Sequence, residues 1–328
     1  MSEPLSVLIV GCGQIAGGYD AGRMDGEVFS HAGAFSRDKR FTISACVEPD
    51  TERRAEFMRE WNVPAGFPDL AACRESGLSF DVASLCAPTP AHERLLYELL
   101  SIPARLVFSE KPLTGDAALS EAVVAAYETA GRPLAVNYFR RWMKEVQQLR
   151  RAVRIGEWGA PQAAVGYYCK GLWNCGSHLI DLLQFVLGPL EPMAVFHKRL
   201  DYLPEDPTLD AVLVTEAGMP VYLVGSDSRE FFSFEMDLTL ASGRIALESL
   251  GRLLRSRRAV TSPTFSGYRN LGSGDWRETD YGTAMLSAAD DLAQCVLAGA
   301  PLISNGRTAL ETERVCGRLM ELAGDAFP

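Results

Sequence analysis

The sequence lacks the marks of several classes of protein. It has eight cysteines but no CxxC pair, and their scatter favours reduced, mostly buried thiols of a cytosolic protein. The N-terminus does not show a basic segment followed by an apolar segment and small residues, which is the order in a signal peptide. No apolar run is long enough to span a membrane. We therefore expect a cytoplasmic protein with no membrane partner.

Positive charge is also scarce. The 32 lysines and arginines are outnumbered by 42 aspartates and glutamates, which gives a net charge of -10. A nucleic-acid partner needs a positive face, so we expect none, whereas a local basic pocket for a phosphorylated small molecule is compatible with this charge. No metal site is predicted, because His31, His92 and His197 have no carboxylates or cysteines at ligand spacing beside them.

A glycine-rich turn directly follows the first apolar run, residues 5–10. It reads Gly11-Cys12-Gly13-Gln14-Ile15-Ala16, which is G-x-G-x-x-A after a predicted strand. The two glycines permit a tight turn and close approach of the backbone to a pyrophosphate, and a helix beginning there would point its free N–H groups at the phosphates. Residues 17–30 lack periodicity and are expected to be an insertion before a second helical piece at residues 31–36.

An acid ends the second predicted strand, residues 41–47. Glu48 stands where the ribose hydroxyls of NAD need a hydrogen-bond acceptor, and its charge would repel the extra phosphate of NADP. Arg53 and Arg54 lie a turn further on, so NADP is disfavoured without being ruled out. The predicted cofactor is NAD.

Strands and helices then alternate, which predicts a parallel, doubly wound sheet. The further strands are expected at residues 81–86, 104–109 and 134–138, with helices at 51–61, 92–100, 114–130 and 142–155. Beyond them, residues 161–168 and 195–250 contain alternating or β-branched segments that suggest a mixed or antiparallel sheet. The 328 residues suit two domains, and we predict a cofactor domain at 1–120 and a substrate and oligomerisation domain at 121–328.

Lys111 comes directly after a buried strand, in the triplet Glu110-Lys111-Pro112. In open α/β sheets that edge is where ligands bind, so Lys111 is either a site residue or an ordinary solvated strand end. Arg140 follows the next strand at the same edge, and it is a substrate ligand or part of a solvated arginine pair with Arg141.

A second polar cluster precedes an apolar helix that we expect to run from Ser177, as its N-terminal cap, to Leu187. His178 would lie in the first turn, with Asp181 about one turn later on the same side. Lys170 and Trp173 could hold a sugar ring, or could equally belong to the core and surface of the turn.

Together these residues resemble the Gfo/Idh/MocA family of nicotinamide-dependent oxidoreductases. The motifs that carry the resemblance are the glycine turn, the Pro-rich loop of residues 87–92, the triplet at Lys111 and Gly176-Ser177-His178-Leu179-Ile180-Asp181. The resemblance implies an N-terminal Rossmann domain and a C-terminal α/β domain with an open, mostly antiparallel sheet, the last helix packing back on the first domain. Homodimers or homotetramers are common in the family.

The resemblance also implies roles for individual residues. Lys111 would contact nicotinamide ribose and substrate, and His178 would transfer the proton. An aspartate commonly stands four residues before that histidine, but here the residue is Asn174, which can orient a hydroxyl and cannot take a proton. Cofactor binding is assigned to Gly11, Gly13, Gln14, Ile15, Glu48, Pro88, Thr89, His92, Glu110 and Lys111, and substrate binding to Arg140, Lys170, Trp173 and Asp181.

The expected activity is NAD-dependent oxidation of a secondary hydroxyl, or reduction of a ketone, in a sugar. The Lys170-Gly171 turn leading into Asn174 and Gly-Ser-His resembles family members of surface-polysaccharide sugar synthesis more than inositol dehydrogenases, which implies a nucleotide-linked sugar as substrate. Two alternatives remain, namely a glycosidase that oxidises its sugar transiently with bound NAD, and a regulator that binds NAD without turnover.

Overall fold

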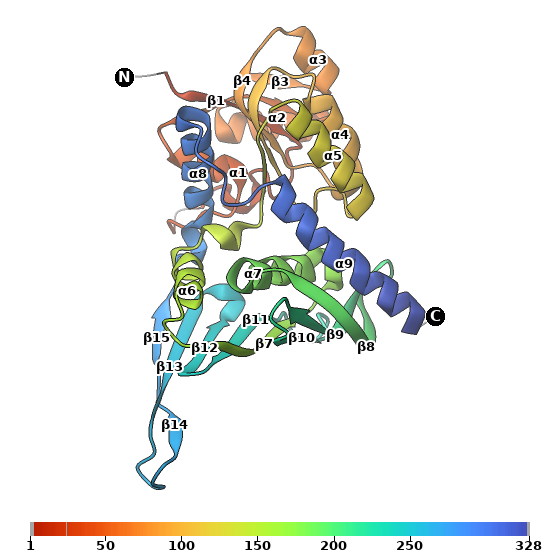
Figure 1. Cartoon of the computed structure of the whole chain (residues 1–328). Helices are drawn as coiled ribbons and strands as arrows, with labels where there is room; N and C mark the ends of the chain where they lie inside the picture. The colour runs from red at the N-terminus through yellow and green to blue at the C-terminus, as the bar shows by residue number, and fades with distance from the viewer. Residues whose placement is uncertain (1–2, 24, 327–328) are drawn as a thin grey trace. The chain divides into compact units, whose positions relative to one another are not determined.

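The computed structural model describes residues 3–23 and 25–326 and divides the chain into two compact units (Figure 1). The first unit comprises Met1–Trp142 and Gly282–Leu310, and the second comprises Met143–Tyr281 and Glu311–Pro328. The assignment of cofactor and substrate binding to domains that meet at residue 120 stays a prediction, and the outermost residues of both predicted domains lie outside the described part.

A parallel sheet of six strands forms the centre of the first unit. The strands are β1 (Leu5–Val10), β2 (Phe41–Val47), β3 (Ala65–Phe67), β4 (Phe80–Leu85), β5 (Ala104–Ser109) and β6 (Leu134–Val136). Their order in the sheet is β3-β2-β1-β4-β5-β6, so the predicted doubly wound fold is confirmed. All six carboxyl ends lie at one edge, where such sheets bind ligands.

Helices cover both faces of this sheet. They are α1 (His31–Arg37), α2 (Thr51–Trp61), α3 (Leu70–Glu75), α4 (His92–Leu99), α5 (Ala117–Thr129), α8 (Ala284–Ala298) and the first turns of α9 (Gly306–Ala326). Successive residues of β1 alternate between two cores: Val7 and Ile9 pack with Phe35 of α1, whereas Leu8 packs with Leu96 of α4. This alternation follows from the two-residue period of a strand and explains why β1 is apolar throughout.

The chain directly after the glycine turn differs from the prediction. An α-helix was expected to begin there, but the chain makes only short helical turns, such as the bond from the Gly17 nitrogen to the Gly13 oxygen (3.2 Å), before the 3₁₀ turn η1 (Gly18–Asp20). The first α-helix begins at His31. A Cβ atom at Gly17 would lie 2.3 Å from Trp61 Nε1, so any larger residue there would have to displace the Trp61 side chain.

The second unit is built on a sheet of nine strands, with helices α6 (Lys144–Arg154) and α7 (Ser177–Leu187). Its strands are β7 (Pro161–Tyr168), β8 (Leu190–Leu203), β9 (Asp206–Thr215), β10 (Pro220–Gly225), β11 (Phe234–Leu240), β12 (Gly243–Glu248), β13 (Leu253–Thr261), β14 (Arg269–Leu271) and β15 (Asp275–Glu278). Strand β7 pairs in parallel with β10, and the other pairs in this sheet are antiparallel. The open, mostly antiparallel sheet that was expected is therefore confirmed.

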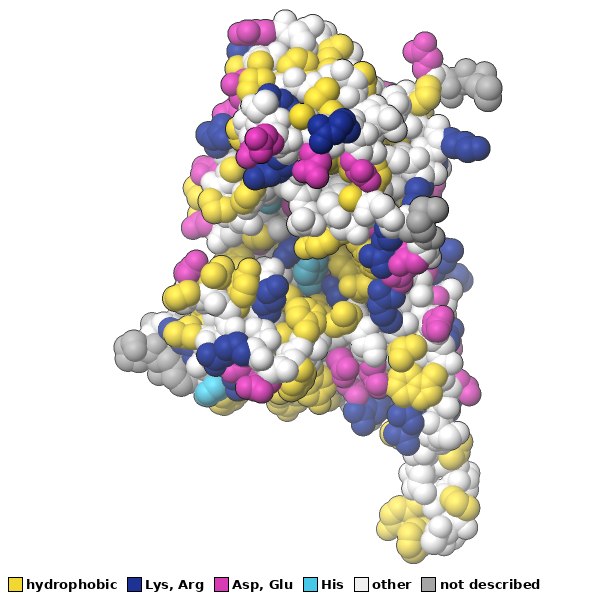
Figure 2. Space-filling view, turned by 180° about the vertical axis from the view of Figure 1, so that it is seen from behind, with side chains coloured by type: hydrophobic (Ala, Val, Ile, Leu, Met, Phe, Trp, Pro, Cys, Tyr) yellow, Lys and Arg dark blue, Asp and Glu magenta, His cyan; other side chains and the backbone are white. Residues whose placement is uncertain are grey.

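Helix α7 covers one face of this sheet, and a Cβ atom at Gly166 would lie 2.6 Å from Leu179 Cδ2. Strands β13 and β14 extend as an arm whose tip carries hydrophobic side chains (Figure 2), among them the exposed Phe265 and Tyr268. Within residues 3–23 and 25–326, no helix is both long and apolar enough to cross a bilayer.

Candidate functional site

The glycine turn is shaped by two glycines that serve different purposes. Gly11 has φ +89°, and a Cβ atom there would lie 2.8 Å from the Ala87 nitrogen, so only glycine lets this turn lie against the chain after β4. At Gly13 a Cβ atom would meet no described atom within 4 Å. The space over Gly13 is therefore clear for close approach of a pyrophosphate, which is what the G-x-G pattern requires.

Glu48 is fixed beside this turn. Its Oε2 atom accepts a hydrogen bond from the Cys12 nitrogen (3.0 Å), and its Oε1 atom accepts one from the Asp50 nitrogen (3.1 Å). The Arg53 guanidinium lies 3.4 Å from the same Oε1 atom. A carboxylate has about four acceptor positions, so Glu48 can hold the turn and still accept ribose hydroxyls.

A cavity of about 530 Å³ opens between the glycine turn and α2. Its lining includes the predicted Gly13 and Gln14 together with the exposed acids Glu56 and Glu60 and the ring of Trp61. The two added acids lie one helical turn apart on α2 and were missed in the sequence, although their spacing of four residues places them on one face. The lining also includes Arg53, so acids and a cation stand together here, and the preference for NAD over NADP stays a prediction.

The Pro-rich loop is tied to the Lys111 turn by a buried histidine. His92 is 1% exposed, and its Nδ1 atom lies 2.8 Å from the Pro112 carbonyl oxygen while Nε2 lies 2.7 Å from the Ala87 oxygen. Pro88 is exposed and Thr89 is half-buried, so these two remain accessible to a cofactor. The cofactor-binding roles predicted for all three stay predictions.

Lys111 follows β5 at the carboxyl edge, and the carboxylate before it is turned into the protein. Glu110 Oε1 lies 2.8 Å from His31 Nε2 and accepts a hydrogen bond from Asn137 Nδ2 (2.6 Å). Glu110 Oε2 accepts the Lys111 amide at 3.2 Å. Burial alone would raise the pKa of Glu110, but His31, Asn137 and Lys111 outweigh it, so the pKa is lowered and the carboxylate stays charged.

His31 was considered in the sequence only as a metal ligand, and Ser84 and Asn137 were not considered at all. They cannot be found from local pattern, because they come from different elements and meet only in the fold. The described residues hold no group of three or more histidines, cysteines or acids placed to bind a metal.

In the second unit, the predicted polar cluster lies on a π-helical turn, Gly171–Gly176, that runs into α7. The Asp206 carboxylate accepts hydrogen bonds from the nitrogens of Trp173 (2.7 Å) and Asn174 (3.0 Å), which fixes the turn. Gly171 has φ +84° and a Cβ atom there would strike Asp206, so glycine is required. The sequence pattern did not reveal Asp206.

The predicted cap at Ser177 is wrong. Its hydroxyl donates to the Trp173 carbonyl oxygen at 2.7 Å, and no side chain caps α7, because the preceding π-helical turn continues directly into it. The predicted end of the helix at Leu187 is confirmed, with Gly188 following at φ +94°.

Most of the site residues predicted in residues 168–183 are more exposed than their neighbours. Within residues 168–183, the partly exposed ones are Lys170, Trp173, Asn174 and His178, and the others are buried. Asp181 is 1% exposed and accepts a hydrogen bond from the Thr312 hydroxyl (3.3 Å), so its carboxylate is held in the interior. Four of the five predicted residues are therefore partly accessible, and the ammonium group of one of them, Lys170, lies 5.0 Å from the centroid of the Tyr202 ring.

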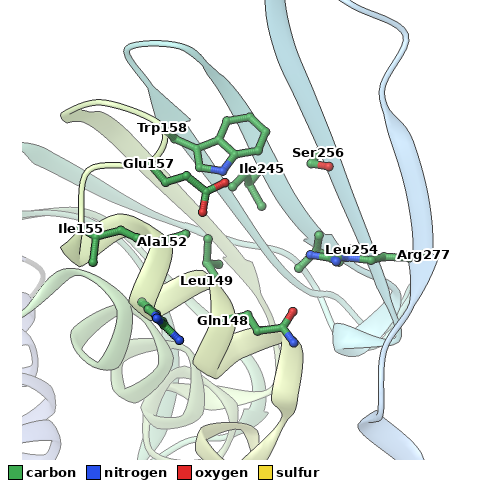
Figure 3. Close-up of a pocket in the computed structure, with 11 residues that line it drawn as sticks. Gln148, Leu149, Ala152, Ile155, Glu157, Trp158, Ile245, Leu254, Ser256 and Arg277 are labelled. Atoms are coloured by element: carbon green, nitrogen blue, oxygen red, sulfur yellow. The ribbon is translucent and has the colours of Figure 1, made fainter.

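Arg140 and Arg141 are 6% and 5% exposed, so they are not the solvated pair that was the alternative. The Arg140 guanidinium lies 4.5 Å from the centroid of the Phe139 ring. Its role toward substrate stays a prediction. A further cavity of about 460 Å³ lies in the second unit beside α6 (Figure 3), and none of its 11 lining residues is a predicted site residue.

These features define a dinucleotide-binding Rossmann unit followed by a unit with a large mixed sheet. Residues 5–138 match the family model described as "Oxidoreductase family, NAD-binding Rossmann fold". This part of the chain is therefore similar to the NAD-binding Rossmann domain of these oxidoreductases, in agreement with the resemblance to the Gfo/Idh/MocA family.

Named relatives agree with this family. D-apiose dehydrogenase of Paraburkholderia graminis is 26% identical over 195 residues, which are 54% of this chain and 52% of the relative, so the match spans about half the length of that protein. Inositol 2-dehydrogenase of Rhizobium meliloti is 22% identical over 72% of this chain and 76% of its own. The WlbA dehydrogenase of Bordetella pertussis, solved with NADH and UDP-GlcNAcA, shares the fold with a TM-score of 0.78, at 17% identity over 99% of this chain and 98% of that chain.

Proposed function

We propose that this chain is an NAD-dependent dehydrogenase that oxidises a secondary hydroxyl, or reduces the corresponding ketone, of a sugar. The observation that carries the proposal is Lys111, a lysine that the Glu110 carboxylate fixes at the carboxyl edge of an NAD-binding sheet. A cation at that place suits an alkoxide that develops during the reaction.

NAD, when bound, accepts or supplies the hydride. Residues of the chain must then accept the hydroxyl proton and stabilise the negative charge that develops on the oxygen. His178, partly exposed at the start of α7, takes the hydroxyl proton, since a neutral imidazole has a ring nitrogen that accepts a proton. Lys111 stabilises the alkoxide. Asn174, whose backbone Asp206 holds, orients a hydroxyl and leaves the proton to His178.

The remaining predicted residues would recognise the substrate. Lys170 and Trp173 lie on the accessible side of the π-helical turn, where a cation and an aromatic ring suit a phosphorylated carrier and a sugar face. A nucleotide-linked sugar is the substrate class that we favour. The WlbA dehydrogenase has the same fold and was solved with UDP-GlcNAcA, which supports this choice. We also propose that the chain forms homodimers or homotetramers.

The test is a nicotinamide-absorbance assay over free sugars, inositol and nucleotide-linked sugars. We expect turnover with at least one nucleotide-linked sugar, and loss of that turnover in His178→Ala. His197→Ala is the matched control, because His197 is exposed on β8 in the same unit. Turnover confined to free inositol or apiose would overturn the substrate class, and sugar release without net NADH would favour the glycosidase.

A further inference from the structure

A buried polar network lies directly under the Lys111 turn. Besides its contact with Glu110, His31 places Nδ1 2.6 Å from the Ser84 hydroxyl. His31 and Ser84 are fully buried, Asn137 is 4% exposed and Glu110 is 9% exposed. The network joins α1, β4 and the chain segments that follow β5 and β6. Four neighbouring parts of the first unit are thus connected at one point below Lys111.

The irregular segment before α1 holds His31 in place. The Asp20 carboxylate accepts hydrogen bonds from the nitrogens of Phe29 (3.0 Å) and Ser30 (2.8 Å) and from the Ser30 hydroxyl (2.7 Å). The Ser30 hydroxyl in turn accepts the Gly33 amide at 3.1 Å and caps α1. The segment that looked like an insertion in the sequence therefore has a function in the fold, because it aims the first residue of α1 at the sheet.

Glu110 is held from inside the protein. Its two oxygens face two side-chain groups, of His31 and Asn137, and one backbone amide, of Lys111. These three partners orient the carboxylate from the protein side. The cofactor-binding role that the sequence suggested for Glu110 stays a prediction.

We propose that His31 is a positioning residue, which fixes the Glu110–Lys111 turn through the Glu110 carboxylate and so sets the place of the Lys111 ammonium group. The proposal rests on the function proposed above for Lys111. Placement matters, since a shift of about 1 Å in a catalytic group can cost about 10²-fold in rate.

Charge supports this arrangement. The groups that face His31 are Ser84, Cys86, Glu110 and Asn137, with the Phe108 ring at 4.5 Å. Burial lowers the pKa of His31, but the Cys86 sulfur as an acceptor and the charged Glu110 carboxylate at 2.8 Å offset it, and the pKa is raised. A charged imidazole gives a stronger and more directional bond to a carboxylate than a neutral group does.

The experiment compares His31→Leu, which removes both ring nitrogens and fills similar volume, with His31→Gln, which keeps an N–H donor for Glu110. We expect His31→Leu to lower kcat by about 10²-fold, with the Kd of NAD changed less than threefold. The kcat of His31→Gln should be at least fivefold higher than the kcat of His31→Leu. His197→Leu is the control, since it removes an exposed histidine of the second unit.

Two further measurements distinguish a positioning role of His31 from a role in stability alone. In a Lys111→Ala background, His31→Leu should add less than a twofold loss of kcat, because a residue that acts through Lys111 has nothing left to position. In protein without NAD or sugar, an amine-reactive reagent should label Lys111 at a changed rate in His31→Leu, relative to the exposed Lys39 of the same sample.

The results that would contradict the proposal for His31 differ from those that would contradict the function proposed for Lys111. An unchanged labelling ratio with additive losses in the double variant would make His31 a core residue only. Full turnover of Lys111→Ala would instead refute the function proposed for Lys111. If His31→Leu does not fold, Asn137→Leu removes the other side-chain donor to the same Glu110 oxygen and carries the same expectations.

Discussion

His31 Nε2 lies 2.8 Å from Glu110 Oε1, although 79 positions of sequence separate the two residues. Their contact is the link between the segment that follows the glycine turn and the lysine at the carboxyl edge of the sheet. The first unit thereby connects its glycine turn to Lys111 through the protein interior.

This contact makes the stability of the protein depend on pH in a defined direction. The pKa of His31 is raised from 6.5 to about 10, so its contribution is complete below pH 6.5 and is lost as pH rises through the folded value. The pKa of Glu110 is lowered, so its contribution is present above its unfolded pKa and is lost in acid. We expect the difference in unfolding free energy between the native protein and His31→Gln to shrink steadily from pH 6 to pH 10 in urea titrations. A difference that grows over that range would contradict the charged pair.

Asp20 should matter for stability far more than an exposed aspartate of the same segment. Asp20→Ala removes the acceptor of two amides and one hydroxyl at the start of α1, and should lower the unfolding free energy by about 3 kcal/mol. Asp25→Ala, at an exposed position, should lower the unfolding free energy much less, because solvent screens its ion pair with Arg23. Denaturant unfolding of both variants measures the difference, and equal losses would remove Asp20 as the anchor of His31.

The two glycines of the turn should respond differently to alanine. Gly11→Ala places a Cβ atom against Ala87 at positive φ, so we expect a loss of about 2 kcal/mol or more in unfolding free energy. In Gly13→Ala the added Cβ atom has no described atom within 4 Å, so the unfolding free energy should not change. The affinity for NAD should fall about tenfold, because the Cβ atom would occupy the space of the pyrophosphate. Calorimetric titration with NAD and urea unfolding together test this, and unchanged affinity in Gly13→Ala would place the pyrophosphate elsewhere.

Glu48 should set the preference for NAD over NADP. If Glu48 accepts the ribose hydroxyls and repels a 2′-phosphate, Glu48→Gln should shift the ratio of the two Kd values toward NADP by about tenfold. Glu52→Gln changes an exposed acid in the first turn of α2 and is the control. An unshifted ratio in Glu48→Gln would mean that Glu56 and Glu60 carry the discrimination instead.

Much of the first unit could be predicted because its strands are short apolar runs bounded by polar residues. Strands β1 and β2 have the bounds that the pattern indicated. Strand β3 was missed because its three residues are only half-buried and give no apolar run. Residues 17–30 could not be interpreted, since their order depends on tertiary contacts of Asp20 that no periodicity reveals.

The candidate site could be proposed from the sequence where its residues lie in a contiguous motif, as they do around Lys111 and His178, and the roles proposed for them stay predictions. It was not predictable where a supporting group comes from a distant strand. Asp206 illustrates this, because it reaches the π-helical turn from β9, 32 residues after Asn174. The Ser177 cap was wrong for a related reason, since local preference gave way to a turn held by that distant carboxylate.

The most direct test of the central claim is the kcat of Lys111→Ala, measured by nicotinamide absorbance on the best sugar substrate. Lys39→Ala, an exposed lysine of the same unit, is the matched control. If Lys111 stabilises the developing alkoxide, kcat should fall by about 10²-fold to 10³-fold while the fold and NAD binding persist. Turnover of Lys111→Ala equal to that of Lys39→Ala would contradict the account.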